Sequence, residues 1–102
     1  MTFDFNEYQR TRRNKRGYVD EIVCADGFSV SVQASEYHYC APRQSGLPSY
    51  ERVEAGFPSA ADPDLMPFVE DRDNPTGTVY GYVPVEVINT VVAKHGGLKS
   101  DA

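Results

Sequence analysis

The chain has 102 residues, 40% of them hydrophobic, which is enough for one domain with a single core. It contains no apolar run of the roughly 18 residues that a membrane span needs. Its first five residues also lack the basic-then-apolar order of a signal peptide. The sequence therefore predicts a soluble, cytoplasmic protein.

The net charge of −5 is unevenly distributed. Residues 1–17 have five basic and two acidic side chains, whereas the remainder has five basic and thirteen acidic ones. An acidic body repels a phosphate backbone, so nucleic acid is an unlikely partner except through the basic segment. The basic patch comprises Arg10, Arg12, Arg13, Lys15 and Arg16. It could bind nucleic acid or an acidic protein surface, or it could be a solvated helix end.

Residues 4–16 are expected to form a short helix. Asp4 is a candidate N-cap, Glu7 stands at the capping-box position and Gly17 ends the segment. Only Phe5 and Tyr8 give this helix an apolar face. We expect residues 1–17 to be a basic helix or arm beside a single domain that covers residues 18–97.

The clearest strand signal is the alternation of apolar and polar residues over 28–35. Asp26-Gly27 before it favours a two-residue type I′ turn, which makes 18–25 the partner strand. The resulting register pairs Ala25 with Phe28, Val23 with Val30, Glu21 with Val32 and Val19 with Ala34. It places Tyr18, Ile22 and Cys24 on the opposite face.

Two further strands are expected at residues 50–57 and 78–83, separated by an acidic, proline-containing passage with one helical turn around 63–69. Alternation in the first places Val53, Ala55 and Phe57 on one face. In the second it places Val79 and Val83 on one face and Tyr80 and Tyr82 on the other.

The last element is predicted to be an amphipathic helix that begins near Pro84 and stops at Gly96. The fold class is thus α+β: a small, mainly antiparallel sheet covered on one face by this helix, with a short N-terminal helix. The apolar side of the C-terminal helix comprises Val85, Ile88, Val91 and Val92, at helical spacing. Residues 98–102 are expected to be a flexible tail.

No motif indicates catalysis, so we expect no enzyme and no cofactor. His38, Cys40 and Cys24 could converge as zinc ligands, but there is no Cys-X-X-Cys pair and no obvious fourth ligand. His38 and Cys40 as base and nucleophile lack an orienting third group. Two cysteines are too few for a disulfide framework, and we expect free thiols. Asp71-X-Asp73 opens like a calcium loop, but Pro75 and Tyr82 occupy later ligand positions.

Seven tyrosines in so short a chain suggest a binding surface, because tyrosine gives a stiff, amphipathic contact area. The alternative is that the rings only cover the open side of a small sheet. The candidate binding residues for a protein or a ligand are Tyr37, Tyr39, Arg43, Tyr50, Arg52, Asp71, Asp73, Tyr80 and Tyr82.

Four stretches resemble a family of small accessory proteins of tailed bacteriophages and prophages. They are residues 26–34, 39–43, 54–59 and 78–84, followed by His95-Gly96-Gly97. The resemblance covers most of residues 18–97. It implies a phage protein that acts inside a bacterium, and it carries no activity, cofactor or site residue with it.

The expected function is that of a non-enzymatic inhibitor, similar to anti-CRISPR proteins, that occupies the surface of a bacterial host or defence protein through acidic and tyrosine-rich loops. In this hypothesis the acidic passage 62–73 mimics nucleic-acid charge against a basic groove. One alternative is a homo-oligomeric binder of a signalling nucleotide, with Arg43, Arg52 and tyrosines holding phosphate and base. Another is a minor virion or assembly protein.

Overall fold

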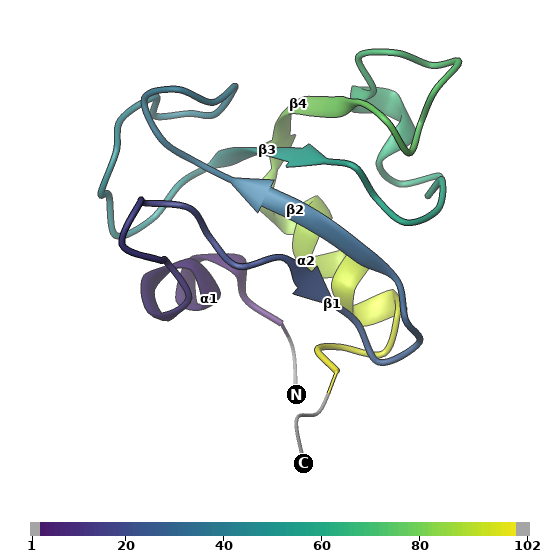
Figure 1. Ribbon diagram of the computed structural model, residues 1–102, viewed down its shortest axis with the longest axis horizontal. Helices are drawn as coiled ribbons and strands as arrows, with labels where there is room; N and C mark the ends of the chain where they lie inside the picture. The colour runs from purple at the N-terminus through teal and green to yellow at the C-terminus, as the bar shows by residue number, and fades with distance from the viewer. Residues whose placement is uncertain (1–2, 100–102) are drawn as a thin grey trace.

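The computed structural model describes residues 3–99, which form a four-stranded antiparallel sheet of order β1-β2-β3-β4 and two α-helices (Figure 1). The predicted α+β class is confirmed. No helix within residues 3–99 is long and apolar enough to cross a membrane. The elements are α1 (Phe5–Thr11), β1 (Ile22–Val23), β2 (Ser29–Gln33), β3 (Arg52–Gly56), the 3₁₀ helix η1 (Met66–Phe68), β4 (Val79–Pro84) and α2 (Val85–Lys94).

The C-terminal helix α2 lies behind the sheet and covers one of its faces (Figure 1). Pro84 is its N-cap, and His95 with the left-handed Gly96 ends it, as predicted. So many β-branched residues lower helix propensity, so packing on the sheet has to stabilise this helix. The four predicted apolar residues Val85, Ile88, Val91 and Val92 are all buried.

The hairpin between β1 and β2 has a different register from the predicted one. Ile22 pairs with Val30 and Val23 with Ser29, because the connecting loop has three residues and Gly27 takes a φ of +95°. Three-residue hairpin loops with a left-handed glycine at the third position are a common alternative to type I′ turns. The one-residue shift moves Ile22 and Cys24 from the outer face, where we expected them, into the core.

A β-bulge interrupts the alternation of β4. Val53 pairs with Val83 and Ala55 with Tyr80, so β4 has one more residue than β3 between these pairs. Tyr80 and Val83 therefore both face the core, and the prediction that Tyr80 shares a face with Tyr82 is wrong. Tyr82 takes a φ of +53° at the bulge and is exposed.

Helix α1 is shorter than predicted. Asp4 accepts hydrogen bonds from the backbone N–H groups of Asn6 and Glu7, as expected of an N-cap. The helix ends at Thr11, since no apolar residue follows Tyr8 and the N–H of Asp20 pairs with the carbonyl of Arg12. Phe5 is fully buried, and its N–H donates to Asn89 Oδ1 of α2, so α1 belongs to the same core.

The segment after α2 pairs with the outer edge of β1. Leu98 forms a bridge with Cys24, and the N–H of Lys99 donates to the carbonyl of Val23. The tail expected from residue 98 thus does not begin before residue 100, and residues 100–102 lie outside the described part of the chain. Pairing of this kind blocks an edge strand against other chains.

Phe57 at the end of β3 was expected on the buried face with Val53 and Ala55, but its side chain is 57% exposed. Its φ of +52° turns the ring away from the core. A left-handed conformation costs a residue with a side chain roughly 1–2 kcal/mol, and this cost is absent for glycine.

We therefore expect Phe57→Gly to raise the free energy of unfolding by about 1 kcal/mol, because it removes strain and only an exposed ring. Phe57→Ala is the matched control, since it removes the ring but keeps the strain, and it should leave stability nearly unchanged. Urea unfolding measures both. Equal midpoints for the two variants would contradict this assignment of strain.

Candidate functional site

The best candidate site is the loop of residues 35–45, which is closely held by hydrogen bonds. Ser35 Oγ accepts the N–H of Tyr37 and lies 2.6 Å from His38 Nδ1. Cys40 Sγ lies 3.1 Å from the carbonyl of Ser35, and the backbone of Ala41 pairs with Arg52 of β3. Such a loop loses little conformational entropy when it binds a partner, because it is already ordered, as in preorganised binding loops.

This loop presents two exposed tyrosines beside the exposed Tyr82 of β4. The exposed fractions are 79% for Tyr37, 44% for Tyr39 and 45% for Tyr82. The ring centroids of Tyr39 and Tyr82 are 6.1 Å apart, and the Arg43 guanidinium lies 5.5 Å from the Tyr39 centroid. We call the surface formed by Tyr37, Tyr39, Arg43, Arg52 and Tyr82 the tyrosine face.

Backbone contacts set the position of Tyr39 and Tyr82. The N–H of Tyr82 donates to the carbonyl of Tyr39, and the N–H of Tyr39 donates to Glu54 Oε1. Arg52 Nη1 donates to the carbonyl of Tyr82. The absence of a side chain at Gly81 lets Tyr39 approach, since a Cβ there would lie 3.3 Å from Tyr39 Cβ. Tyr82 is thus fixed in a strained conformation, as is frequent at ligand-binding sites.

Two predicted site tyrosines are structural. Tyr50 is 2% exposed, and its hydroxyl donates to the carbonyl of Gln44. Tyr80 is fully buried, and its hydroxyl donates to the carbonyl of Pro75 at 2.5 Å. The alternation rule assigned Tyr80 to the outer face because a bulge leaves no clear mark in the sequence.

One residue that was not predicted as a site residue, Tyr18, extends the tyrosine face. Tyr18 is 51% exposed, and its ring contacts the His38 ring edge-on at 6.1 Å. The sequence signal was present, since Tyr18 follows the basic segment directly, but the assumed register treated it only as part of a strand.

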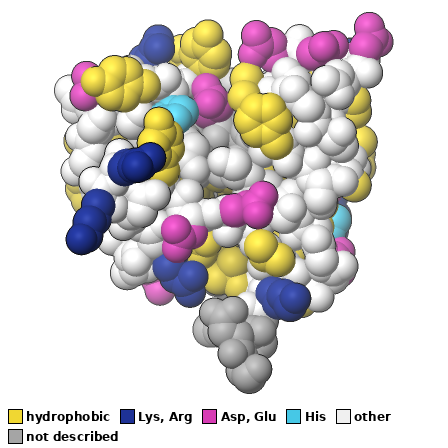
Figure 2. All heavy atoms as spheres, in the orientation of Figure 1, with side chains coloured by type: hydrophobic (Ala, Val, Ile, Leu, Met, Phe, Trp, Pro, Cys, Tyr) yellow, Lys and Arg dark blue, Asp and Glu magenta, His cyan; other side chains and the backbone are white. Residues whose placement is uncertain are grey.

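The acidic passage separates into an internal and an external part. Asp62 is only 2% exposed, and Lys94 Nζ lies 2.9 Å from its Oδ1 and 2.7 Å from Asp64 Oδ2. Asp71 and Asp73 are exposed, with Asp71 Oδ1 accepting the N–H of Asp73. Figure 2 shows Asp and Glu side chains along the edge of the molecule formed by this loop. We call Glu70, Asp71 and Asp73 the acidic edge.

His95 joins three parts of the chain at the end of α2. Its Nδ1 lies 2.6 Å from Asp26 Oδ2 in the hairpin loop, and its Nε2 lies 2.9 Å from Asp62 Oδ2. The Phe28 ring stacks on the imidazole at 4.0 Å. Both ring nitrogens can donate only when the imidazole is protonated, so the geometry fits an imidazolium between two carboxylates.

The pKa values in this cluster shift in the directions that favour the charged forms. Burial lowers the pKa of His95, but hydrogen bonds to Asp26 and Asp62 outweigh it and raise the pKa above 6.5. Burial raises the pKa of Asp62, but Lys94 and His95 bring it below 3.8. The hydrogen bond to Asp64 raises the pKa of Lys94. These contacts join the hairpin loop, the acidic passage and the end of α2, so we assign the cluster a structural role.

The cysteines and His38 do not gather into a site. Both thiols are free and buried, and burial raises the pKa of Cys24 to about 11. A reactive cysteine needs the opposite shift. In the part of the chain that the structure describes, no three His, Cys, Asp or Glu side chains are arranged as metal ligands.

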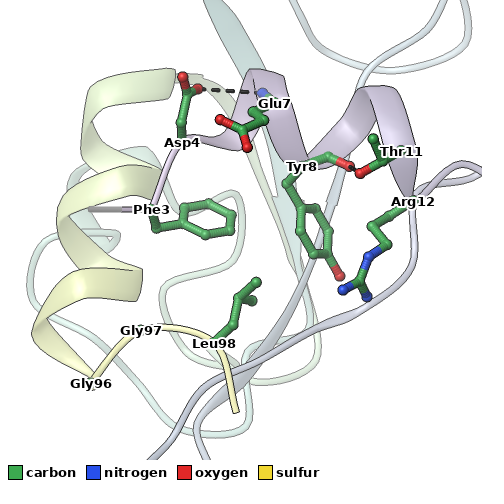
Figure 3. A pocket seen from close by; sticks show the side chains of 9 residues that line it. All are labelled: Phe3, Asp4, Glu7, Tyr8, Thr11, Arg12, Gly96, Gly97 and Leu98. Atoms are coloured by element: carbon green, nitrogen blue, oxygen red, sulfur yellow. Dashed lines mark hydrogen bonds between the residues drawn. The ribbon is translucent and has the colours of Figure 1, made fainter. Parts of the chain in front are cut away.

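An open groove of about 520 Å³ lies between α1 and the segment after α2 (Figure 3). Phe3 points into it from the segment before α1 and Leu98 from the segment after α2, and Tyr8 and Arg12 lie across from Phe3. A smaller hollow of about 330 Å³ shares Tyr8, Arg12 and Leu98 with it. Arg43 and Arg52, which we expected to hold a nucleotide, line neither hollow.

Comparisons with protein-family models, curated proteins and solved structures gave no significant match.

The His95 cluster leads to a pH prediction. Because the folded-state pKa of His95 is raised, its contribution to stability is fully present below pH 6.5 and is lost as pH rises through the folded-state value. The free energy of unfolding of the wild type should therefore exceed that of His95→Gln by an amount on the order of 1 kcal/mol at acidic pH. This difference should shrink toward alkaline pH. Urea unfolding from about pH 5.5 to about pH 8.5 measures this difference. A difference independent of pH would show that His95 is not charged in the folded state.

Proposed function

We propose that the chain is a non-enzymatic binding protein that attaches to another protein through the tyrosine face. The observation that carries this proposal is the set of three exposed tyrosines, Tyr37, Tyr39 and Tyr82, on a backbone that hydrogen bonds hold in place. Rings that only covered the sheet would lie flat on it and lose most of their exposure, as Tyr50 and Tyr80 do in the core.

The composition of the tyrosine face supports a protein partner. Tyrosine and arginine are the residues most enriched at the energetic centres of protein interfaces. The Arg43 guanidinium over Tyr39 combines both in one contact. The resemblance to phage accessory proteins makes a host bacterial protein the proposed partner, which the chain would inhibit by covering its surface in the cytoplasm.

Photo-crosslinking in bacterial cells tests the tyrosine face. A benzoylphenylalanine at position 37 or 82 should yield the same discrete adduct, because both positions would lie in one interface. The matched control is position 86 on α2, where the exposed Glu86 should give none. Discrete adducts from position 86, or none from 37 and 82, would contradict the proposal.

Removal of two rings gives the energetic test. In the chain with the crosslinker at position 37, Tyr39→Ala or Tyr82→Ala should weaken binding by about thirtyfold each if the rings act as hot spots. Phe57→Ala removes an equally exposed ring outside the tyrosine face and should leave the adduct yield unchanged. Equal effects of all three would indicate a general loss of surface hydrophobicity instead.

The acidic edge is a second proposed contact, in which Asp71 and Asp73 mimic nucleic-acid charge. Asp62 cannot take part, since it is buried and its carboxylate pairs with Lys94 and His95, and Asp64 already pairs with Lys94 at the surface. Changing Asp71 and Asp73 to Ala should reduce affinity by a fewfold and make the complex less sensitive to salt. Unchanged affinity would limit the interface to the tyrosine face.

A further inference from the structure

The chain between α1 and β1 forms a tight turn with a defined shape. Asn14 organises it: its backbone N–H donates to the carbonyl of Tyr18, and its Oδ1 accepts the N–H groups of Arg16 and Tyr18. Gly17 takes a φ of +89° and donates to the carbonyl of Asn14. We call residues 12–17 the basic turn.

One arginine of the basic turn points inward and braces it. Arg13 Nη2 lies 2.6 Å from Gln9 Oε1, and its Nη1 lies 2.6 Å from the carbonyl of Gly17 and 3.3 Å from that of Ala34. Arg13 therefore supports the turn and does not belong to a surface patch. Two neighbouring cations also have partners within the chain. Arg10 Nε donates to the carbonyl of Pro48, and the Arg12 guanidinium lies over the Tyr8 ring.

Lys15 and Arg16 at the tip are exposed, and neither side chain has an ion-pair or hydrogen-bond partner anywhere in residues 3–99. The only carboxylate-paired cations of the described chain, Lys94 and His95, lie at the end of α2. The tip thus offers two uncompensated charges on a preformed turn.

The basic turn adjoins the tyrosine face. Tyr18 follows the turn, is tied to it through Asn14 and contacts His38 of the loop that bears Tyr37 and Tyr39. Figure 2 shows Lys and Arg side chains on the side of α1 and the basic turn, next to large hydrophobic side chains, with the acidic edge on the far side. A partner that covers the tyrosine face would reach Lys15 and Arg16 as well.

We infer that the basic turn binds an acidic segment of the protein that occupies the tyrosine face. This inference rests on the proposed function and adds the chemistry of the partner: carboxylates opposite Lys15 and Arg16. A protein segment fits better than nucleic acid, because a phosphate backbone would continue past this small cationic tip onto a chain of net charge −5. The opposite charges at the two sides would also orient the partner on approach.

Charge reversal at the tip tests the inference in the same crosslinking chain. Lys15→Glu and Arg16→Glu together should weaken formation of the adduct from position 37 roughly tenfold, with a smaller effect of each alone. Lys99→Glu in the segment after α2 matches each single reversal in charge, lies outside the tyrosine face and the acidic edge, and should have no such effect. Both tip positions are exposed and unpaired, so urea midpoints should stay unchanged and separate binding from folding.

The outcomes distinguish the inference from the proposed function. Equal adduct yields from wild type and the double reversal would overturn the acidic-segment assignment and leave the tyrosine face in place. A lack of any discrete adduct from positions 37 and 82 in the unaltered chain would instead remove the proposed function itself.

A direct measurement with purified protein identifies the class of anion. Fluorescein-labelled poly-glutamate and oligo-dT of matched charge are titrated with the wild type and with the double reversal, and anisotropy is recorded at low salt. Weak poly-glutamate binding that the double reversal abolishes supports the inference. Tighter binding of oligo-dT, or identical curves for the two proteins, would overturn it.

Discussion

The packing of α2 against the sheet is the constraint on which the other features depend. This helix is rich in β-branched residues and would be marginal alone, so its buried side has to be covered by the apolar faces of the strands. This contact buries one face of a small sheet and leaves the other face without a covering helix. The exposed tyrosines Tyr37, Tyr39 and Tyr82 lie in the loop of residues 35–45 and at the bulge of β4, outside this contact.

The charged cluster at the end of α2 links this helix to the hairpin loop and to the acidic passage. Asp62 is almost fully buried, and a carboxylate in such a position needs charged partners to offset its desolvation. Lys94 and His95 provide them, and His95 also reaches Asp26. The hairpin loop, the acidic passage and the helix end are thereby joined, whereas Glu70, Asp71 and Asp73 of the same passage are exposed to solvent.

The tyrosines divide into two groups by their hydroxyl partners and their burial. Tyr50 and Tyr80 are buried and donate to backbone carbonyls, as buried tyrosines generally must. Tyr37, Tyr39 and Tyr82 keep large exposed fractions on a fixed backbone. Side chains that are both exposed and rigidly held are suited to contact a partner, whereas rings that only cover the sheet would be buried against it. This difference is the basis of the proposed function.

The sequence by itself determined the elements whose signals are local: the caps and apolar spacing of α2, the alternation of β2, the Asp4 cap of α1 and the helical turn within the acidic passage. It also proposed Tyr37, Tyr39, Arg43, Arg52 and Tyr82 as candidate binding residues, and these five side chains are exposed. Only the tertiary structure decided the register of the β1–β2 hairpin and the bulge at Tyr82, because each depends on which residues across the sheet can be buried together. These two one-residue shifts placed Ile22, Cys24 and Tyr80 in the core, and no periodicity within a single strand records them.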